Sequence, residues 1–172
     1  MTSSDLWDEE TAERYDEVSA EMFQPAVLDP AVDFLASLAG AGPALEFAIG
    51  TGRVAIPLPA RGVPVSGIEL SQPMVDQLRR KVSADELPVA IGDMTTVRVP
   101  GRFSLVYVVW NSIGNLRTQD EQVRCFRNAA RHLAPGGPLR HRVVGAGHPA
   151  LPAGAGGGAV RRHRPPSRLR HP

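Results

Sequence analysis

Two acids and two glycines near the ends of two apolar runs are the residues most able to do chemistry. Glu46 lies inside the run A-L-E-F-A-I-G-T-G, whose turn carries Gly50 and Gly52. Glycines allow backbone to approach a ligand that a Cβ would push away. Glu69 ends a second run, V-P-V-S-G-I-E-L, 17 residues beyond Gly52. An acid at the end of the second strand is where doubly wound folds hold a ribose hydroxyl pair, so the pattern predicts a nucleotide-binding turn.

Further motifs follow at the ends of later apolar runs. G-D-M at 92–94 comes after the expected strand 87–91, and W-N-S at 110–112 ends the nearly continuous apolar run 102–110. An apolar run of this kind is typical of a parallel strand buried on both faces. The sequence A-P-G-G at 134–137 then closes an amphipathic segment. Repeated strand and turn signals predict an α/β fold.

Besides a crossover helix over 53–60, four helical segments are expected to position these turns. Their ranges are 5–23, 27–38, 71–82 and 119–133. In the second, Val27, Ala31, Phe34, Leu35 and Leu38 recur at spacings of three and four and are expected to face the core. In the fourth, the residues expected to face inward are Val123, Phe126, Ala130 and Leu133. In the first, Leu6, Trp7, Tyr15 and Val18 could form one side of an acidic helix or of two short helical turns.

The order E-F-A-I-G-T-G-R, G-I-E-L-S, G-D-M, L-V-Y-V-V-W-N and L-A-P-G-G resembles class I S-adenosylmethionine-dependent methyltransferases of the small, single-domain bacterial type. The resemblance extends from about Tyr15 to Gly137. It implies a doubly wound, mostly parallel Rossmann-like sheet and S-adenosyl-L-methionine as cofactor. It also implies methyl transfer to an O, N or C nucleophile of a small molecule.

The resemblance assigns roles residue by residue. Glu69 would bind the ribose, and Asp93 would accept from the adenine amino group while the Met94 backbone donates to the ring. Glu46 would contact the ammonium end, and Tyr15, in a lid formed by residues 1–24, would close over the cofactor. The full set of expected cofactor-binding residues is Tyr15, Glu46, Ala48, Gly50, Gly52, Arg53, Glu69, Leu70, Met74, Asp93, Met94, Trp110 and Asn111. No catalytic base and no metal ligand is identified.

Two segments depart from the family pattern, the turn at Ala48 and the helix that follows it. Ala48 stands where the family has the first of three glycines, which crowds the turn. Pro57 and Pro59 lie in the crossover helix expected over 53–60, where each removes a backbone donor and shortens the helix.

Several alternatives remain open from sequence. G-T-G-R-V-A at 50–55 also fits the dinucleotide fingerprint, and Glu69 would then bind an NAD ribose. Two features oppose the dinucleotide interpretation. Glu46 would be unfavourable near a pyrophosphate, and G-D-M at 92–94 suits the amine and ring edge of an adenine. Met74 could instead be core, Asn111 could cap a turn rather than orient a substrate hydroxyl, and His132 is interpreted as a helix-end residue rather than a catalyst.

Composition narrows the function classes. The chain has 172 residues, enough for one domain. Residues 1–138 contain all 18 acids and twelve of the 19 basic residues, so this body is acidic and a small-molecule acceptor is expected rather than nucleic acid. Cys125 is the single cysteine, which excludes an intrachain disulfide and favours a reducing cytoplasm. Neither a signal peptide nor a membrane span is expected, and the oligomeric state is left open.

The tail 139–172 differs in composition from the expected methyltransferase domain, 1–138. It contains seven arginines and no acid, and Gly, Pro and Ala dominate it. This composition predicts disorder, or a frameshifted reading of GC-rich DNA that once encoded strand five and a closing hairpin. Loss of those elements would leave, as a second hypothesis, a remnant that binds cofactor without catalysing transfer.

Overall fold

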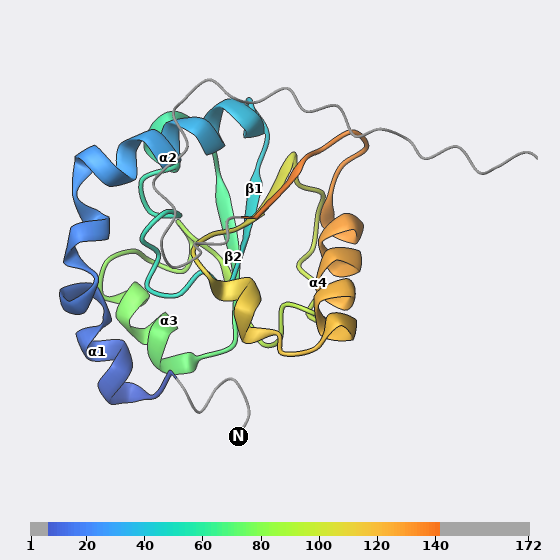
Figure 1. The fold of residues 1–172 in the computed structure, drawn as a ribbon. Helices are drawn as coiled ribbons and strands as arrows, with labels where there is room; N and C mark the ends of the chain where they lie inside the picture. The colour runs from blue at the N-terminus through green and yellow to red at the C-terminus, as the bar shows by residue number, and fades with distance from the viewer. Residues whose placement is uncertain (1–6, 142–172) are drawn as a thin grey trace, which may run out of the picture.

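A five-stranded, fully parallel sheet organises the chain in the computed structural model, which describes residues 7–141 (Figure 1). The strand order is β3-β2-β1-β4-β5. The strands are β1 (Ala44–Phe47), β2 (Val65–Glu69), β3 (Val89–Ile91), β4 (Leu105–Val108) and β5 (Leu139–His141). The order reverses between β1 and β4, which are direct neighbours in the sheet. The predicted doubly wound parallel α/β fold is therefore confirmed.

Helices cover both faces of the sheet. The α-helices are α1 (Glu9–Val18), α2 (Pro25–Ala39), α3 (Gln72–Arg79) and α4 (Gln119–His132). Short 3-10 turns are η2 (Ala20–Phe23), η3 (Pro59–Arg61) and η4 (Ser112–Asn115). In Figure 1, α2 and α3 lie on one side of the sheet and α4 on the other. Within residues 7–141, no helix is long and apolar enough to cross a membrane.

Alternation along the strands divides the core into two layers. In β4, Leu105 and Tyr107 join the cluster that contains residues of α2 and α3, whereas Val106 and Val108 join the cluster that contains residues of α4. All four are fully or almost fully buried. Burial on both faces explains why this strand reads as a continuous apolar run.

The inward faces of two helices differ from the predicted ones. In α2 the buried residues are Val32, Leu35 and Ala39, while Val27 and Phe34 are 55% and 56% exposed. This helix is apolar around much of its circumference, so spacing alone does not identify the buried stripe.

In α4 the buried residues are Cys125, Asn128, Ala129 and His132, whereas Val123 and Ala130 are exposed. The prediction ignored Asn128 and His132 because they are polar, although polar groups can face the core when they form hydrogen bonds there, as the Asn128 amide nitrogen and both His132 ring nitrogens do. Val18, placed on the packed side of the first helix, is 75% exposed, and Leu6 lies outside the described residues.

The expected crossover helix over 53–60 is not a regular helix. The amide of Ile56 donates to the carbonyl of Gly52 at 3.0 Å, and the segment continues as turns into η3. Pro57 and Pro59 lack the donors that would extend the helix. The segment nevertheless packs well, with Val54 and Leu58 buried.

The expectation that an apolar strand after Gly137 is missing is wrong for its first residues. Residues 139–141 form β5, which pairs in parallel with β4 so that Leu139 aligns with Val106. Strand pairing is made by backbone groups, so an arginine-rich sequence can still supply it at a sheet edge. Residues 142–172, on which the other expectations for the tail depend, lie outside the described residues.

Candidate functional site

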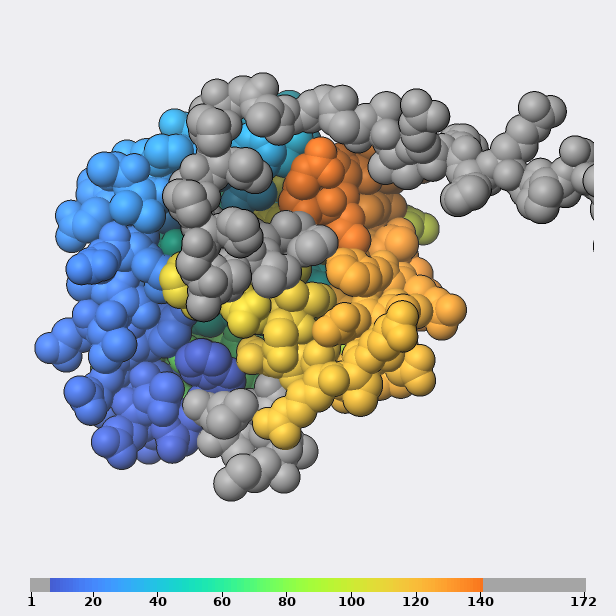
Figure 2. All heavy atoms as spheres, viewed as in Figure 1, coloured from blue at the N-terminus to red at the C-terminus, as the bar shows by residue number. Residues whose placement is uncertain are grey.

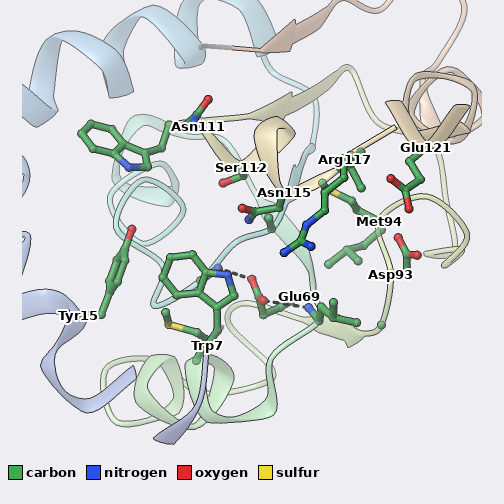
Figure 3. Close-up of a pocket in the computed structure, with 18 residues that line it drawn as sticks. Trp7, Tyr15, Glu69, Asp93, Met94, Asn111, Ser112, Asn115, Arg117 and Glu121 are labelled. Atoms are coloured by element: carbon green, nitrogen blue, oxygen red, sulfur yellow. Dashed lines mark hydrogen bonds between the residues drawn. The ribbon is translucent and has the colours of Figure 1, made fainter. Parts of the chain in front are cut away.

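A cavity lies at the carboxyl ends of the strands, next to the point where strand order reverses. Its volume is about 740 Å³. Its walls come from the turn after β1, the end of β2, the loop after β3, the loop after β4 and the N-terminal helix segment (Figure 3). Open α/β sheets bind ligands at this edge, and the cavity has the size range of a small-molecule site.

The turn after β1 has left-handed backbone at three positions. Ala48, Gly50 and Gly52 have φ of 53°, 57° and 85°. Nothing lies within 4 Å of a Cβ built on Gly50, so this backbone is open towards the cavity that it lines. A Cβ on Gly52 would instead meet side-chain carbons of Ile56 and Leu78 at 3.0 Å. Gly50 therefore leaves its backbone accessible from the cavity, whereas Gly52 allows Ile56 and Leu78 to pack closely against the turn.

Glu69 joins this turn to the end of β2. Its Oε2 accepts from the Gly50 amide at 2.8 Å, and its Oε1 accepts from the amides of Leu70 and Ser71, both at 2.9 Å. The side chain is 6% exposed and reaches the cavity wall. Burial raises the pKa of Glu69, while the three backbone donors act in the opposite direction. The carboxyl group is thus held in place before any ligand arrives.

The loop after β3 is fixed from behind by α4. The Asn128 amide nitrogen donates to the carbonyls of Met94 at 2.9 Å and Val97 at 2.8 Å. In front, Asp93 Oδ1 accepts from the Thr95 amide at 2.7 Å, and Asp93 and Met94 line the cavity. Helix α4 therefore sets the position of the backbone expected to meet an adenine ring.

His132 completes this support. Its Nε2 lies 3.0 Å from the Val99 amide, which can only donate, so Nε2 is the acceptor and Nδ1–H donates to the Asn128 carbonyl at 2.8 Å. The ring is buried, and desolvation lowers the pKa of His132. The interpretation of His132 as a structural residue rather than a catalyst fits this geometry.

Glu46 lies behind the turn and is not among the residues that line the cavity. It is 1% exposed, and its Oε2 accepts from the Tyr107 hydroxyl at 2.9 Å. Burial raises the pKa of Glu46 from 4.5 to about 8, and the charge of Glu69 adds to this, while Tyr107 and Arg53 oppose it. The expected contact between Glu46 and a cofactor ammonium group stays a prediction.

The N-terminal segment covers one side of the cavity. Tyr15 and Trp7 both line it, with ring centroids 5.7 Å apart in an edge-to-face arrangement. The neighbouring Asp16 accepts from the Thr51 hydroxyl in the turn after β1 and pairs with Lys81 beyond α3. Asp16 thus fixes the helix that carries Tyr15 to the elements that form the site.

The loop after β4 forms the opposite wall. Trp110 has φ of 61°, an outlier for a bulky residue, and Arg53 lies over its ring, with Cζ 5.8 Å from the centroid. Asn111 and Asn115 follow on the same wall. Strained backbone of this kind is often found at functional sites. In Figure 2 this yellow segment lies between the blue N-terminal helices and the orange α4.

The cavity brings together ten of the predicted cofactor-binding residues. They are Tyr15, Ala48, Gly50, Glu69, Leu70, Met74, Asp93, Met94, Trp110 and Asn111. The other three predicted residues, Glu46, Gly52 and Arg53, are not among those that line the cavity. Met74 is 3% exposed and lines the cavity, so its core and ligand roles are compatible.

Other lining residues were not predicted as site residues. They are Trp7, Ile68, Gly92, Ser112, Asn115, Leu116, Arg117 and Glu121. For residues 112–117, the available signal was their place directly after a buried parallel strand, where ligands are expected. Trp7 gave only an ambiguous helical pattern.

Comparison with known proteins gives consistent matches. The family model described as "Methyltransferase domain" matches residues 44–137. A relative from Saccharopolyspora spinosa, dTDP-4-amino-2,3,4,6-tetradeoxy-D-glucose N,N-dimethyltransferase, is 37% identical over 93 residues, which cover 54% of this chain and 36% of the relative. The matches to curated relatives span between 36% and 56% of the relatives' length, about half or less in most.

Solved structures agree. The CcbJ methyltransferase from Streptomyces caelestis aligns with a TM-score of 0.60 at 41% identity, covering 63% of this chain and 45% of that one. The glycopeptide N-methyltransferase MtfA in complex with S-adenosyl-L-methionine aligns with a TM-score of 0.58 at 28% identity, covering 64% and 47%.

Ala48→Gly is expected to stabilise the fold by roughly 0.5 kcal/mol, because about 1–2 kcal/mol of left-handed strain is relieved and the extra chain entropy of glycine is smaller. Ala130→Gly, at an exposed position of α4, is the matched control and should lose about 1 kcal/mol. Urea unfolding of both variants measures the difference. A loss in Ala48→Gly equal to that in Ala130→Gly would contradict the strain at residue 48.

Glu46→Gln is expected to change how stability depends on pH. The native state holds the Glu46 proton up to a pKa of about 8, against 4.5 in a free chain, so Glu46 makes the wild type lose stability as pH rises from about 4.5 to 8. Glutamine removes this titration while still accepting from Tyr107. The variant should gain on the order of 4 kcal/mol relative to wild type between pH 5 and pH 8.5. Parallel stability curves from urea unfolding would show that Glu46 is not protonated in the fold.

Proposed function

Because the chain belongs to the class I S-adenosylmethionine-dependent methyltransferase family, we propose that it transfers a methyl group from S-adenosyl-L-methionine to an amine of a small molecule. Related proteins are described as N-methyltransferases of amino sugars and glycopeptides, which supports nitrogen among the O, N and C acceptors. The acidic body supports a small molecule over nucleic acid. A reducing cytoplasm suits the single, buried Cys125.

One observation carries the proposal: the preset Glu69 carboxyl group at the cavity wall, beside open backbone at Gly50. A carboxylate suits a pair of ribose hydroxyl donors, and the open backbone leaves room for the rest of a nucleoside. Asp93 and the Met94 backbone lie on the next strand end for adenine, with Leu70 and Met74 as apolar walls. The residues present therefore fit this cofactor.

The protein's contribution to the reaction is alignment and desolvation. When bound, S-adenosyl-L-methionine supplies a methyl group on a sulfonium, which is already a good leaving group. Tyr15, Trp7 and Trp110 line the cavity and would exclude water from a bound ligand. Asn111 would orient the acceptor, and a neutral amine needs no base to attack. No catalytic base is assigned.

The competing dinucleotide function is less compatible with the site. Glu46 is buried directly beneath the turn that would meet a pyrophosphate. That turn also has Glu69 Oε2 already engaged by the Gly50 amide, one of the donors that a phosphate would need. These features support S-adenosylmethionine over NAD.

Calorimetric titration of the purified protein with S-adenosylhomocysteine, and separately with NAD, tests the function. Saturable binding of S-adenosylhomocysteine with no heat from NAD is expected. Tight binding of NAD would overturn the assignment. Binding without methyl transfer to any amine acceptor would instead favour a cofactor-binding remnant.

Glu69→Ala is expected to weaken S-adenosylhomocysteine binding by about 1–3 kcal/mol, or roughly 5- to 150-fold, because ribose hydroxyls lose their acceptor. Asp76→Ala removes an exposed acid of α3 away from the cavity and is the matched control. Unchanged affinity in Glu69→Ala would show that it is not the ribose ligand.

Glu69 also holds backbone amides, so a second arm separates the two roles. The 2′,3′-dideoxy analogue of S-adenosylhomocysteine should bind wild type and Glu69→Ala with similar affinity, since the lost interaction is already absent. If the analogue suffers from the substitution as much as the natural ligand does, the effect comes from the turn and not from ribose.

A further inference from the structure

We propose that Arg117 forms an anion subsite in the cavity, which holds a phosphoryl or carboxylate group of the methyl acceptor. The proposal rests on the proposed function, because it names a chemical feature of the substrate of that same site. It concerns a residue outside the predicted cofactor-binding set. Its basis is a cation placed in a ligand cavity with its donors unused.

Among residues 7–141, Arg117 is the only basic residue that lines the cavity. It lies between η4 and the N-cap of α4, and in Figure 3 its side chain points into the cavity from the side that carries Ser112 and Asn115. Across residues 7–141, no carboxylate lies within 4.0 Å of its guanidinium, and no hydrogen bond from its side chain is formed. Five N–H donors are therefore available to a ligand.

The acids of the cavity are each engaged elsewhere. Glu69 accepts from three backbone amides, and Asp93 accepts from the Thr95 amide. Glu121 closes the capping box of α4 by accepting from the Thr118 amide, which lowers the pKa of Glu121. These carboxylates are fixed by backbone donors, so they do not turn towards Arg117.

Neutral polar groups that line the same cavity are also available. No hydrogen bond from the side-chain amides of Asn111 and Asn115 is found within the described part of the chain, although both line the cavity. Ser112 donates to the Val109 carbonyl at 3.1 Å and keeps its oxygen as an acceptor. In Figure 3 the Asn115 amide lies near the Arg117 guanidinium, and a guanidinium beside an amide suits an oxyanion attached to a polar molecule better than an apolar acceptor.

Position within the cavity assigns this group to the acceptor. The residues expected to hold the ribose and adenine of the cofactor lie at the ends of β2 and β3, whereas Arg117, Ser112 and Asn115 come from the segment after β4. Guanidinium groups recognise phosphate and carboxylate in the same bidentate manner. The shared chemistry is therefore an oxyanion, and its source is left to experiment.

Fluorescence titration tests the subsite, because both tryptophans of the chain, Trp7 and Trp110, line the cavity. Protein with and without saturating S-adenosylhomocysteine is titrated with sodium pyrophosphate and with sodium acetate, against sodium chloride at equal ionic strength. We expect saturable quenching by pyrophosphate, acetate or both, beyond that of chloride. A pyrophosphate response identifies a phosphoryl group, and an acetate response a carboxylate.

Three variants assign the response to this residue. Arg117→Ala should weaken oxyanion binding by about tenfold or more, and Arg117→Lys by about threefold, because lysine keeps the charge without the planar fork. Arg127→Ala removes an exposed arginine of α4 outside the cavity and should match wild type. Circular dichroism and thermal unfolding confirm that each variant is folded.

Three results would overturn the subsite. These are no saturable response to either oxyanion in wild type, an equal loss in Arg127→Ala, or wild-type oxyanion affinity in Arg117→Ala. If Arg117→Ala instead weakens S-adenosylhomocysteine binding and leaves oxyanion binding intact, the residue serves the cofactor and the proposal is wrong. If S-adenosylhomocysteine fails to bind while oxyanion binding depends on Arg117, the proposed function falls and the subsite stands.

Discussion

The Glu69 carboxyl group joins two strand ends that the sheet alone would leave independent. Three backbone amides converge on it, from Gly50 in the turn after β1 and from Leu70 and Ser71 after β2. A buried carboxylate needs such donors, because desolvation alone would favour its neutral form. The same bonds hold the turn in its left-handed conformation and place an acceptor at the cavity wall. Ligand recognition here depends on a group whose first role is to organise backbone.

Strained backbone follows each of the two strands between which the order of the sheet reverses, β1 and β4. Ala48 after β1 and Trp110 after β4 are the non-glycine residues with positive φ in the described chain. Neighbouring parallel strands β1 and β4 bring these two turns to the same edge of the sheet. Buried hydrogen bonds on either side, from Tyr107 to Glu46 and from Asn128 to the loop after β3, hold the surroundings in place. Such over-determination is what allows strained backbone to persist.

Sequence predicted the parallel α/β fold and ten of the residues that line the cavity, because a glycine turn, an acid at a strand end and an apolar run each have a strong local cause. The turn at 50–52 was predictable because glycine adopts backbone conformations that other residues avoid. The role of the acid at 69 was predictable because it ends an apolar run that forms a parallel strand. The faces of α2 and α4 were not predictable from apolar spacing. One helix is apolar on several sides, and the other buries Asn128 and His132 through hydrogen bonds to a distant loop.

Contacts between residues distant in sequence explain the remaining differences between the predicted and the observed structure. Tyr107 gave no signal beyond an apolar strand, since its role exists only through Glu46, 61 positions earlier. Strand β5 forms from a sequence without an apolar pattern because the edge of β4 offers unpaired backbone groups. Arg117 was unremarkable in sequence, and its place in the cavity depends on the short η4 turn that precedes it.

A crystal structure of the protein with S-adenosylhomocysteine bound tests the central claim most directly. The account predicts the ribose hydroxyls within hydrogen-bond distance of Glu69, and adenine between Leu70 and the loop that carries Asp93 and Met94. It also predicts that the turn at Gly50 keeps its present backbone. A ligand bound elsewhere, or bound here with its ribose turned away from Glu69, would contradict it.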